Sequence, residues 1–319
     1  MNLTIATSVD DVTGDAEILA GGTDLSERLR SGIARRPVVD ISRLPGLDAI
    51  SGTGDDPTTI GALVTIATVG ASDRVRRDYP ALAAPAQTLA TPQIRSMGTM
   101  GGVLCQRNRC WYYRHPDLPC FKNGGDSCPA REGDNHFGAA FDLGPCVAAH
   151  PSSIALALLA YEATFETTTR QAVPIAELYG DGSDPSRDHQ LDDGELLTMV
   201  TLPPPTPQEH AGYVRLMSRA LAEWPLVECV ARLVVADDTI RLARVCIGGV
   251  ANIPLRLQEV EGQLIARPPT LATFEAAAQH AIDRATSPLE QTRYKLPMIV
   301  GTVLEALERA TNRQPSATG

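Results

Sequence analysis

The feature of this sequence that most restricts its fold is a cysteine-rich segment in the first half of the chain. Residues 108–146 read NRCWYYRHPDLPCFKNGGDSCPAREGDNHFGAAFDLGPC and hold four of the seven cysteines among the 319 residues. Because the segment is crowded with Gly, Pro and charged residues, it indicates an irregular loop. The fold has to accommodate four thiols in one loop, and the rest of the sequence has to indicate what they do there.

Length and composition are typical of a soluble globular protein. A chain of this length can bury a large core and usually divides into two or three domains. Hydrophobic residues make up 43% and charged residues 21% of the chain, and no run of apolar residues is long enough to span a membrane. The net charge of −10 argues against nonspecific binding to nucleic acid. The start lacks the pattern of a secretory signal, so we expect reduced thiols and a cytoplasmic location.

Apolar patterning in the first half predicts alternating strands and helices. Residues 17–32 read as a strand, a Gly-Gly pair and a helix, and residues 37–42 read as a second strand. After the cysteine-rich segment, a helix is expected to begin near Ser152 or Ser153. A strand with period-two alternation follows it. This part of the chain is therefore expected to contain both helices and sheets.

The second half begins at a proline-rich joint, residues 202–210, which marks the predicted domain boundary. Residues 225–250 read as a strand, an Asp-Asp turn and a second strand. Helical patterns follow at 271–285 and 294–311. The last helix is expected to pack its apolar face against the core. The residues of that face are Leu296, Ile299, Val300, Val303, Leu304 and Leu307.

Two glycine pairs are candidate phosphate-binding sites. Gly21-Gly22 opens a helix after a strand, and Gly101-Gly102 ends a strand-like segment in a glycine-rich turn. Glycine lets backbone N–H groups approach an anion without a Cβ clash, although two ordinary tight turns remain the alternative. Because a carboxylate beside a pyrophosphate is repulsive, Asp24 is interpreted as a helix cap, with Glu27 completing a capping box. Neither a Rossmann nor a P-loop glycine motif occurs.

The two glycine motifs together resemble a known family. The segment LAGGTDL, followed about seventy residues later by TPQIRSMGTMGG, is similar to the FAD-binding medium subunit of molybdenum hydroxylases, the xanthine dehydrogenase family. Further similar segments, such as VVDISRLPGL and YKLPMIVGTVLEAL, follow in order over nearly the whole chain. The resemblance implies an α+β fold with two domains. Residues 1–205 would form a two-part FAD-binding domain of the vanillyl-alcohol oxidase/MurB type, with subdomains of about 1–55 and 56–205. Residues 206–319 would form a C-terminal α+β domain of the CO dehydrogenase flavoprotein type.

The resemblance also implies which residues bind FAD. In that family the backbone of the first motif and the threonine and glycines of the second hold the pyrophosphate. The matching positions are Ile18, Leu19, Ala20, Gly21, Gly22, Thr23, Asp24, Leu25, Ser26, Thr99, Gly101 and Gly102. Leu197 resembles an adenine-packing position, with a plain core leucine as the alternative. Val103 and Ser153 stand where relatives often have Asn and Asp, and residues 218–228 are placed near the flavin.

For the cysteine-rich segment, the resemblance is to the branch that includes 4-hydroxybenzoyl-CoA reductase and bacterial aldehyde oxidoreductases. It implies that a loop at residues 105–147 binds a [4Fe–4S] cluster, and the expected ligands are Cys110, Cys120, Cys128 and Cys146. Four thiolates suit a cubane cluster, and an irregular backbone can supply N–H groups that tune its potential. Structural zinc and purely structural cysteines are the alternatives, although the paired knuckles that zinc favours are absent.

The other cysteines and the aromatic residues of the loop are assigned structural roles. Cys105, Cys229 and Cys246 lie in apolar contexts and are expected in the core. The aromatic residues next to the first cluster cysteine, Trp111, Tyr112 and Tyr113, are expected to shield the cluster from solvent. Trp224, in the stretch placed near the flavin, is expected either to cover the ring or to pack in the core.

The function implied by the resemblance is that of an FAD and [4Fe–4S] electron-transfer subunit in a heterotrimeric molybdenum hydroxylase. A large subunit would carry molybdopterin and oxidise an aldehyde or an N-heterocycle, and a small subunit would carry two [2Fe–2S] clusters. The alternatives are a free-standing flavoprotein reductase or oxidase, and a zinc-stabilised assembly subunit with no redox role. Export to the periplasm together with a partner is an alternative to the cytoplasmic location.

Overall fold

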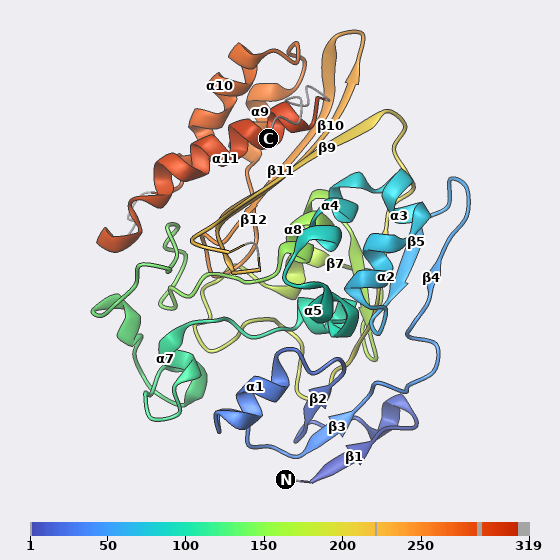
Figure 1. Ribbon diagram of the computed structural model, residues 1–319, viewed down its shortest axis with the longest axis vertical. Coiled ribbons are helices and arrows are strands. Elements are labelled where there is room, and N and C mark those ends of the chain that lie inside the picture. Colours follow the sequence, from blue (N-terminus) through green and yellow to red (C-terminus); the bar gives the residue numbers. More distant parts are fainter. Residues whose placement is uncertain (1, 221, 286–288, 312–319) are drawn as a thin grey trace.

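A computed structural model of the chain is shown in Figure 1, and it describes residues 2–220, 222–285 and 289–311. Three β-sheets follow one another along the sequence, a small parallel sheet, a five-stranded sheet with most of the helices, and a long antiparallel sheet under the last helices. The expected α+β class is therefore confirmed. None of the helices in the described ranges is long and apolar enough to cross a membrane.

The N-terminal sheet has the strand order β1-β3-β2, and both strand pairs are parallel. Its elements are β1 (Leu3–Ile5), β2 (Glu17–Leu19), α1 (Leu25–Arg30) and β3 (Val38–Asp40). The strand, Gly-Gly pair and helix predicted for residues 17–32 are thus present as β2, a short loop and α1. The loop between β2 and α1 carries the first glycine pair at the edge of this sheet.

The middle sheet has the order β4-β5-β8-β6-β7, and all of its pairs are antiparallel. Its strands are β4 (Ile50–Ser51), β5 (Thr58–Gly61), β6 (Thr164–Thr167), β7 (Val173–Pro174) and β8 (Leu197–Leu202). The helices packed with it are α2 (Ile66–Ala71), α3 (Asp73–Asp78), α4 (Pro80–Thr88), α5 (Pro92–Met97), α6 (Met100–Leu104) and α8 (Ser153–Ala160). Helix α8 begins where the sequence predicts, because the Ser152 hydroxyl accepts the N–H of Ala155 at 3.3 Å.

The cysteine-rich segment lies between α6 and α8 and is mostly irregular, as expected. It contains the short helix α7 (Trp111–Arg114) and two 3-10 turns, Phe121–Asn123 and Pro129–Arg131. In Figure 1 the segment forms green loops that extend beside α1. A single helical turn thus follows the first of the four predicted ligand cysteines.

The C-terminal sheet has the order β12-β11-β10-β9 and is antiparallel. Its strands are β9 (Glu209–Met217), β10 (Pro225–Ala236), β11 (Thr239–Gly248) and β12 (Leu255–Arg256). The helices over it are α9 (Gln258–Leu264), α10 (Leu271–Gln279) and α11 (Lys295–Arg309). Asp237 and Asp238 both have φ of 50°, which is the left-handed conformation of the predicted two-residue hairpin turn.

The C-terminal sheet is buried on both faces and thereby joins the two halves of the chain. On β10, Cys229 and Ala231 pack under α9–α11, whereas Val230 belongs to the core of the middle sheet. This follows from the period of two in a strand. The core face predicted for the last helix is present: Ile299, Val303 and Leu307 are fully buried, and Leu296, Val300 and Leu304 pack partly buried against the same core.

Candidate functional site

The two glycine motifs lie against each other. A Cβ built on Gly21 would stand 1.6 Å from the carbonyl oxygen of Met97, just before the second motif, so only glycine permits this approach. Gly22 has φ of +70°, a conformation that side chains rarely adopt. In the described part of the chain, the backbone N–H groups of Gly21, Gly22 and Thr23 make no hydrogen bond. Free amides on a tight glycine loop suit a phosphate.

The second motif forms a helix, which corrects the sequence prediction. Thr99 has extended backbone and pairs with Thr65 in a single bridge, but the glycines that follow lie in α6 and do not form an irregular turn. The cause is a cap, because the Thr99 hydroxyl accepts the N–H of Gly102 at 3.2 Å. Gly101 is tightly packed, since a Cβ there would lie 3.1 Å from that of Ala62.

Both motifs face one cavity of about 300 Å³, here called the glycine groove. The predicted residues that line it are Ile18, Ala20, Gly21, Gly22, Thr23, Asp24, Leu25, Thr99, Gly101, Gly102 and Leu197. Of the other two predicted residues, Leu19 packs against a small apolar cluster with Leu25, and Ser26 is exposed on α1. The rest of the wall is mixed in charge. Guanidinium groups come from Arg28, Arg36, Arg107 and Arg187, and carboxylates come from Glu17, Asp192, Asp193 and Glu195.

Asp24 occupies the N-cap position of α1, but its side chain does not cap the helix, so the predicted capping box is wrong. The carboxylate forms ion pairs with three arginines instead. A guanidinium nitrogen lies 2.5 Å from a carboxylate oxygen in Arg109, 2.7 Å in Arg114 and 3.2 Å in Arg28. Burial alone would raise the pKa of Asp24, but the charges of Arg109 and Arg114 outweigh it and hold the pKa below its usual value. Asp24 therefore ties the first glycine motif to the cysteine-rich segment.

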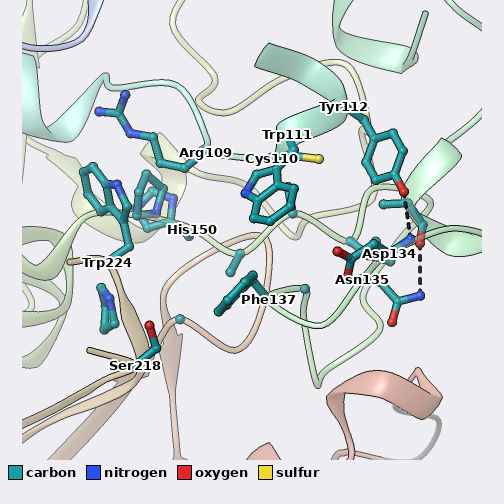
Figure 2. A pocket seen from close by; sticks show the side chains of 18 of the residues that line it. Arg109, Cys110, Trp111, Tyr112, Asp134, Asn135, Phe137, His150, Ser218 and Trp224 are labelled. Atoms are coloured by element: carbon teal, nitrogen blue, oxygen red, sulfur yellow. Dashed lines mark hydrogen bonds between the residues drawn. The ribbon is translucent and has the colours of Figure 1, made fainter. Parts of the chain in front are cut away.

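A second cavity of about 330 Å³, here called the aromatic cavity, lies beside that ion cluster and is shown in Figure 2. The Arg109 guanidinium lies over the Trp224 ring, 4.5 Å from its centroid. Trp111 and Phe137 face each other with ring centroids 5.9 Å apart. Trp224 is 48% exposed, so it is not a core residue. Five residues of the stretch expected near the flavin line this cavity: Ser218, Arg219, Glu223, Trp224 and Pro225.

The four predicted ligand cysteines line a third, small cavity, here called the thiol cavity. Its wall includes Cys110, Cys120, Cys128 and Cys146. Burial raises the pKa of Cys110 and Cys120, and it raises that of Cys146 to about 11. Nearby backbone N–H groups act in the opposite direction on the pKa of these three thiols, for example that of Ala148 on Cys146. In the described ranges, no three His, Cys, Asp or Glu residues already have the spacing to hold a single metal ion.

The remaining cysteine and aromatic predictions have mixed outcomes. All seven cysteines are free thiols, and Cys229 and Cys246 are fully buried, as expected. Cys105 is only partly buried and lines the glycine groove. Tyr112 and Tyr113 line the thiol cavity. The prediction that Trp111 shields the cluster from solvent is wrong, since Trp111 is 64% exposed and turns toward Phe137 in the aromatic cavity.

Comparison with known proteins identifies the class. The family described as "FAD binding domain in molybdopterin dehydrogenase" matches residues 2–205. The family described as "CO dehydrogenase flavoprotein C-terminal domain" matches residues 212–309. The chain belongs to the FAD-binding medium subunits of the molybdenum hydroxylase family, and it is a subunit of an oxidoreductase complex.

Relatives and solved structures cover nearly the whole chain. The aldehyde oxidoreductase FAD-binding subunit PaoB of Escherichia coli (strain K12) is 33% identical over 96% of this chain and 94% of the relative. The carbon monoxide dehydrogenase medium chain of Hydrogenophaga pseudoflava is 25% identical over 94% and 90%. Carbon monoxide dehydrogenase of that species, in a form lacking the Mo-pyranopterin moiety, has the same fold. Its TM-score is 0.76, at 22% identity and 98% coverage of both chains. Quinoline 2-oxidoreductase of Pseudomonas putida 86 has a TM-score of 0.73 at 19% identity, covering 97% and 96%.

Proposed function

We propose that one FAD molecule extends from the glycine groove into the aromatic cavity. The groove suits the ADP half, because free backbone N–H groups and four arginines face it. The aromatic cavity suits the flat isoalloxazine ring, because Trp111, Phe137 and Trp224 line it. The two cavities are neighbours, since Asp24 lines the groove and binds Arg109, which lines the aromatic cavity.

We propose further that the thiol cavity holds a [4Fe–4S] cluster on Cys110, Cys120, Cys128 and Cys146. The supporting observation is that all four side chains line one cavity although up to 36 positions separate them. Backbone N–H groups near three of the sulfurs would stabilise thiolates and tune the potential of the cluster. Structural zinc is the alternative occupant.

The proposed role is electron transfer within a heterotrimer. Substrate would be oxidised on a molybdopterin-bearing large subunit, and a small subunit with two [2Fe–2S] clusters would connect it to this chain. FAD, when bound, supplies the redox chemistry, while the protein holds and orients it. Cys110, Tyr112 and Ala148 line both the thiol cavity and the aromatic cavity, which supports electron exchange between the two sites. A cytoplasmic location remains part of the proposal.

The single observation that carries this function is the arrangement of three cavities around the Asp24–Arg109 pair, within a family that binds FAD. The test compares the isolated chain, loaded with FAD and its cluster, with the chain reconstituted with both partner subunits. The isolated chain should not oxidise an aldehyde or hydroxylate a heterocycle. In the complex, rapid-mixing spectra should show flavin bleaching after substrate is added. Substrate-driven bleaching at the rate of turnover in the isolated, molybdenum-free chain would instead establish a free-standing flavoprotein.

A further inference from the structure

Two histidines, His150 in the aromatic cavity and the partly buried His189 in the glycine groove, each have a buried ring nitrogen with no hydrogen-bond partner among the described residues. His150 lines the aromatic cavity and is 4% exposed, and its Nε2 is buried and unpaired. His189 lines the glycine groove, and its Nδ1 is buried and unpaired. A buried polar atom without a hydrogen-bond partner destabilises the fold. Each nitrogen therefore marks a position where a ligand or a water supplies the missing bond.

His150 is held firmly in the wall of the aromatic cavity. Its ring meets Tyr179 edge-on with centroids 4.5 Å apart, and its backbone N–H donates to Ala251 at 2.7 Å. His150 lines the same cavity as Arg109 and Trp224 (Figure 2). Burial lowers the pKa of His150 to about 4, so the imidazole is neutral at physiological pH. A neutral imidazole has one donor and one acceptor nitrogen, so it can serve either kind of ligand group.

His189 is also neutral, but its surroundings are charged. Burial, followed by the charge of Arg107, lowers the pKa of His189 to about 3. Arg187 lowers it further, whereas Asp188 opposes the shift. In a groove that already contains several guanidinium groups, a neutral ring adds a directed hydrogen bond instead of more charge. Such a group discriminates between ligands by the position of a donor or acceptor.

We infer that His189 and His150 bind the two halves of one FAD molecule, His189 the ADP half and His150 the polar edge of the isoalloxazine ring. The inference rests on the proposed function, in which FAD extends through both cavities. The isoalloxazine ring has apolar faces and carries its hydrogen-bonding atoms at one edge. The aromatic side chains can contact the faces, and Nε2 of His150 supplies a partner for the edge.

The test uses the full-length chain freed of FAD and three probes: FAD, ADP and riboflavin. His150→Phe should lower the affinity for riboflavin and FAD about three- to tenfold, which is the effect of one lost hydrogen bond, and should leave the affinity for ADP unchanged. His189→Phe should lower the affinity for ADP and FAD by a similar factor and leave the affinity for riboflavin unchanged. His150→Gln keeps a donor and an acceptor and should recover part of the riboflavin affinity. The control is His280→Phe, since His280 is exposed on the far helices beside Asp283 and should affect no probe.

A second measurement needs no substitution. With ¹⁵N-labelled histidine in the wild-type chain, ADP should shift the ring signals of His189, and riboflavin those of His150. The inference is overturned if ligand affinities and ring signals do not respond, because the two nitrogens then bind water only. It is also overturned if each histidine responds to the opposite probe. Failure of the wild-type chain to bind FAD at all would contradict the proposed function itself. That outcome is distinct from a wild-type chain that binds FAD while its histidines do not respond.

Discussion

The Asp24 carboxylate accepts a hydrogen bond from Arg114 at 2.7 Å, although 90 positions separate the two residues in the sequence. Asp24 belongs to the first glycine motif, and Arg114 closes the helical turn that follows Cys110. The same carboxylate binds Arg109, which lies over Trp224 of the C-terminal part. One acidic side chain thus connects the proposed FAD groove, the cysteine-rich segment and the aromatic cavity.

Asp24→Asn should therefore disturb both proposed cofactor sites. The side chains of Asp24, Arg28 and Arg114 are only 10–12% exposed, so the substitution leaves buried cations without compensation. Loss of one partner in such a cluster costs about 3–5 kcal/mol of unfolding free energy. FAD and iron content should fall together. The matched control is Asp193→Asn in the same groove. Asp193 is 75% exposed, and its pair with Arg36 is worth about 0–1 kcal/mol. Equal effects from the two variants would show that Asp24 has no connecting role.

The glycine groove can be tested with two glycines that share a backbone conformation. Gly22 and Gly32 both have φ of +70°, so alanine at either position strains the backbone by about 1–2 kcal/mol. A Cβ at Gly22 would meet the Ser26 hydroxyl at 2.9 Å, whereas a Cβ at Gly32 has nothing within 4 Å. Gly22→Ala should shift the free amides and weaken FAD binding about tenfold or more. Gly32→Ala should lose similar stability and keep FAD. Full FAD affinity in folded Gly22→Ala would place the pyrophosphate elsewhere.

The thiol cavity predicts a separable effect on metal content. Cys120→Ser or Cys128→Ser removes one of four thiols that line the cavity, so iron and acid-labile sulfide should fall together while FAD remains. Both quantities can be measured on anaerobically purified protein, with EPR spectra of the reduced form. Cys246→Ala, on β11 and buried against the core of the middle sheet, should keep the cluster. Zinc without acid-labile sulfide in the wild-type protein would contradict the cluster and favour a structural metal site.

Local patterns in the sequence predict much of this fold. The cap at Ser152, the turn at Asp237-Asp238 and the apolar face of α11 each depend on neighbours within a few residues. The cysteine-rich loop was found because thiols are rare enough to notice. These features need no knowledge of distant partners.

The features that local patterns do not predict depend on residues far away in the sequence. The sequence predicts a turn at Gly101-Gly102, and glycine does disfavour helices, but the Thr99 cap and packing against Ala62 outweigh that preference. The position of Asp24 suggests a helix cap, and only the folded chain brings Arg109 and Arg114 to it. His150 and His189 carry no local signal, because their importance lies in a buried ring nitrogen without a partner. A histidine next to an apolar helix start, as in AHPSSIALALL, is the one clue that could have singled out His150.

A buried lysine at the base of the aromatic cavity gives a prediction about pH. Lys295 is 1% exposed, and its Nζ donates to the carbonyls of Gly249 at 2.7 Å, Gly138 at 2.8 Å and Phe137 at 3.3 Å. All three acceptor residues line the cavity. Lys295→Met should therefore loosen this wall and weaken riboflavin binding, because two segments of the wall lose their shared anchor.

Burial lowers the pKa of Lys295 from 10.5 to about 7. Between these values the unfolded chain binds more protons at this position than the folded chain, so the free energy of unfolding rises with pH. The contribution of Lys295 increases from about pH 7 to about pH 10.5, by up to about 1.4 kcal/mol per pH unit. The measurement is urea unfolding of the ligand-free wild type and Lys295→Met at several pH values, since other titrating groups cancel in the difference. As pH rises through this window, the free energy of unfolding of the wild type should increase relative to that of the variant. A constant difference would show that the three carbonyls keep the ammonium charged in the fold.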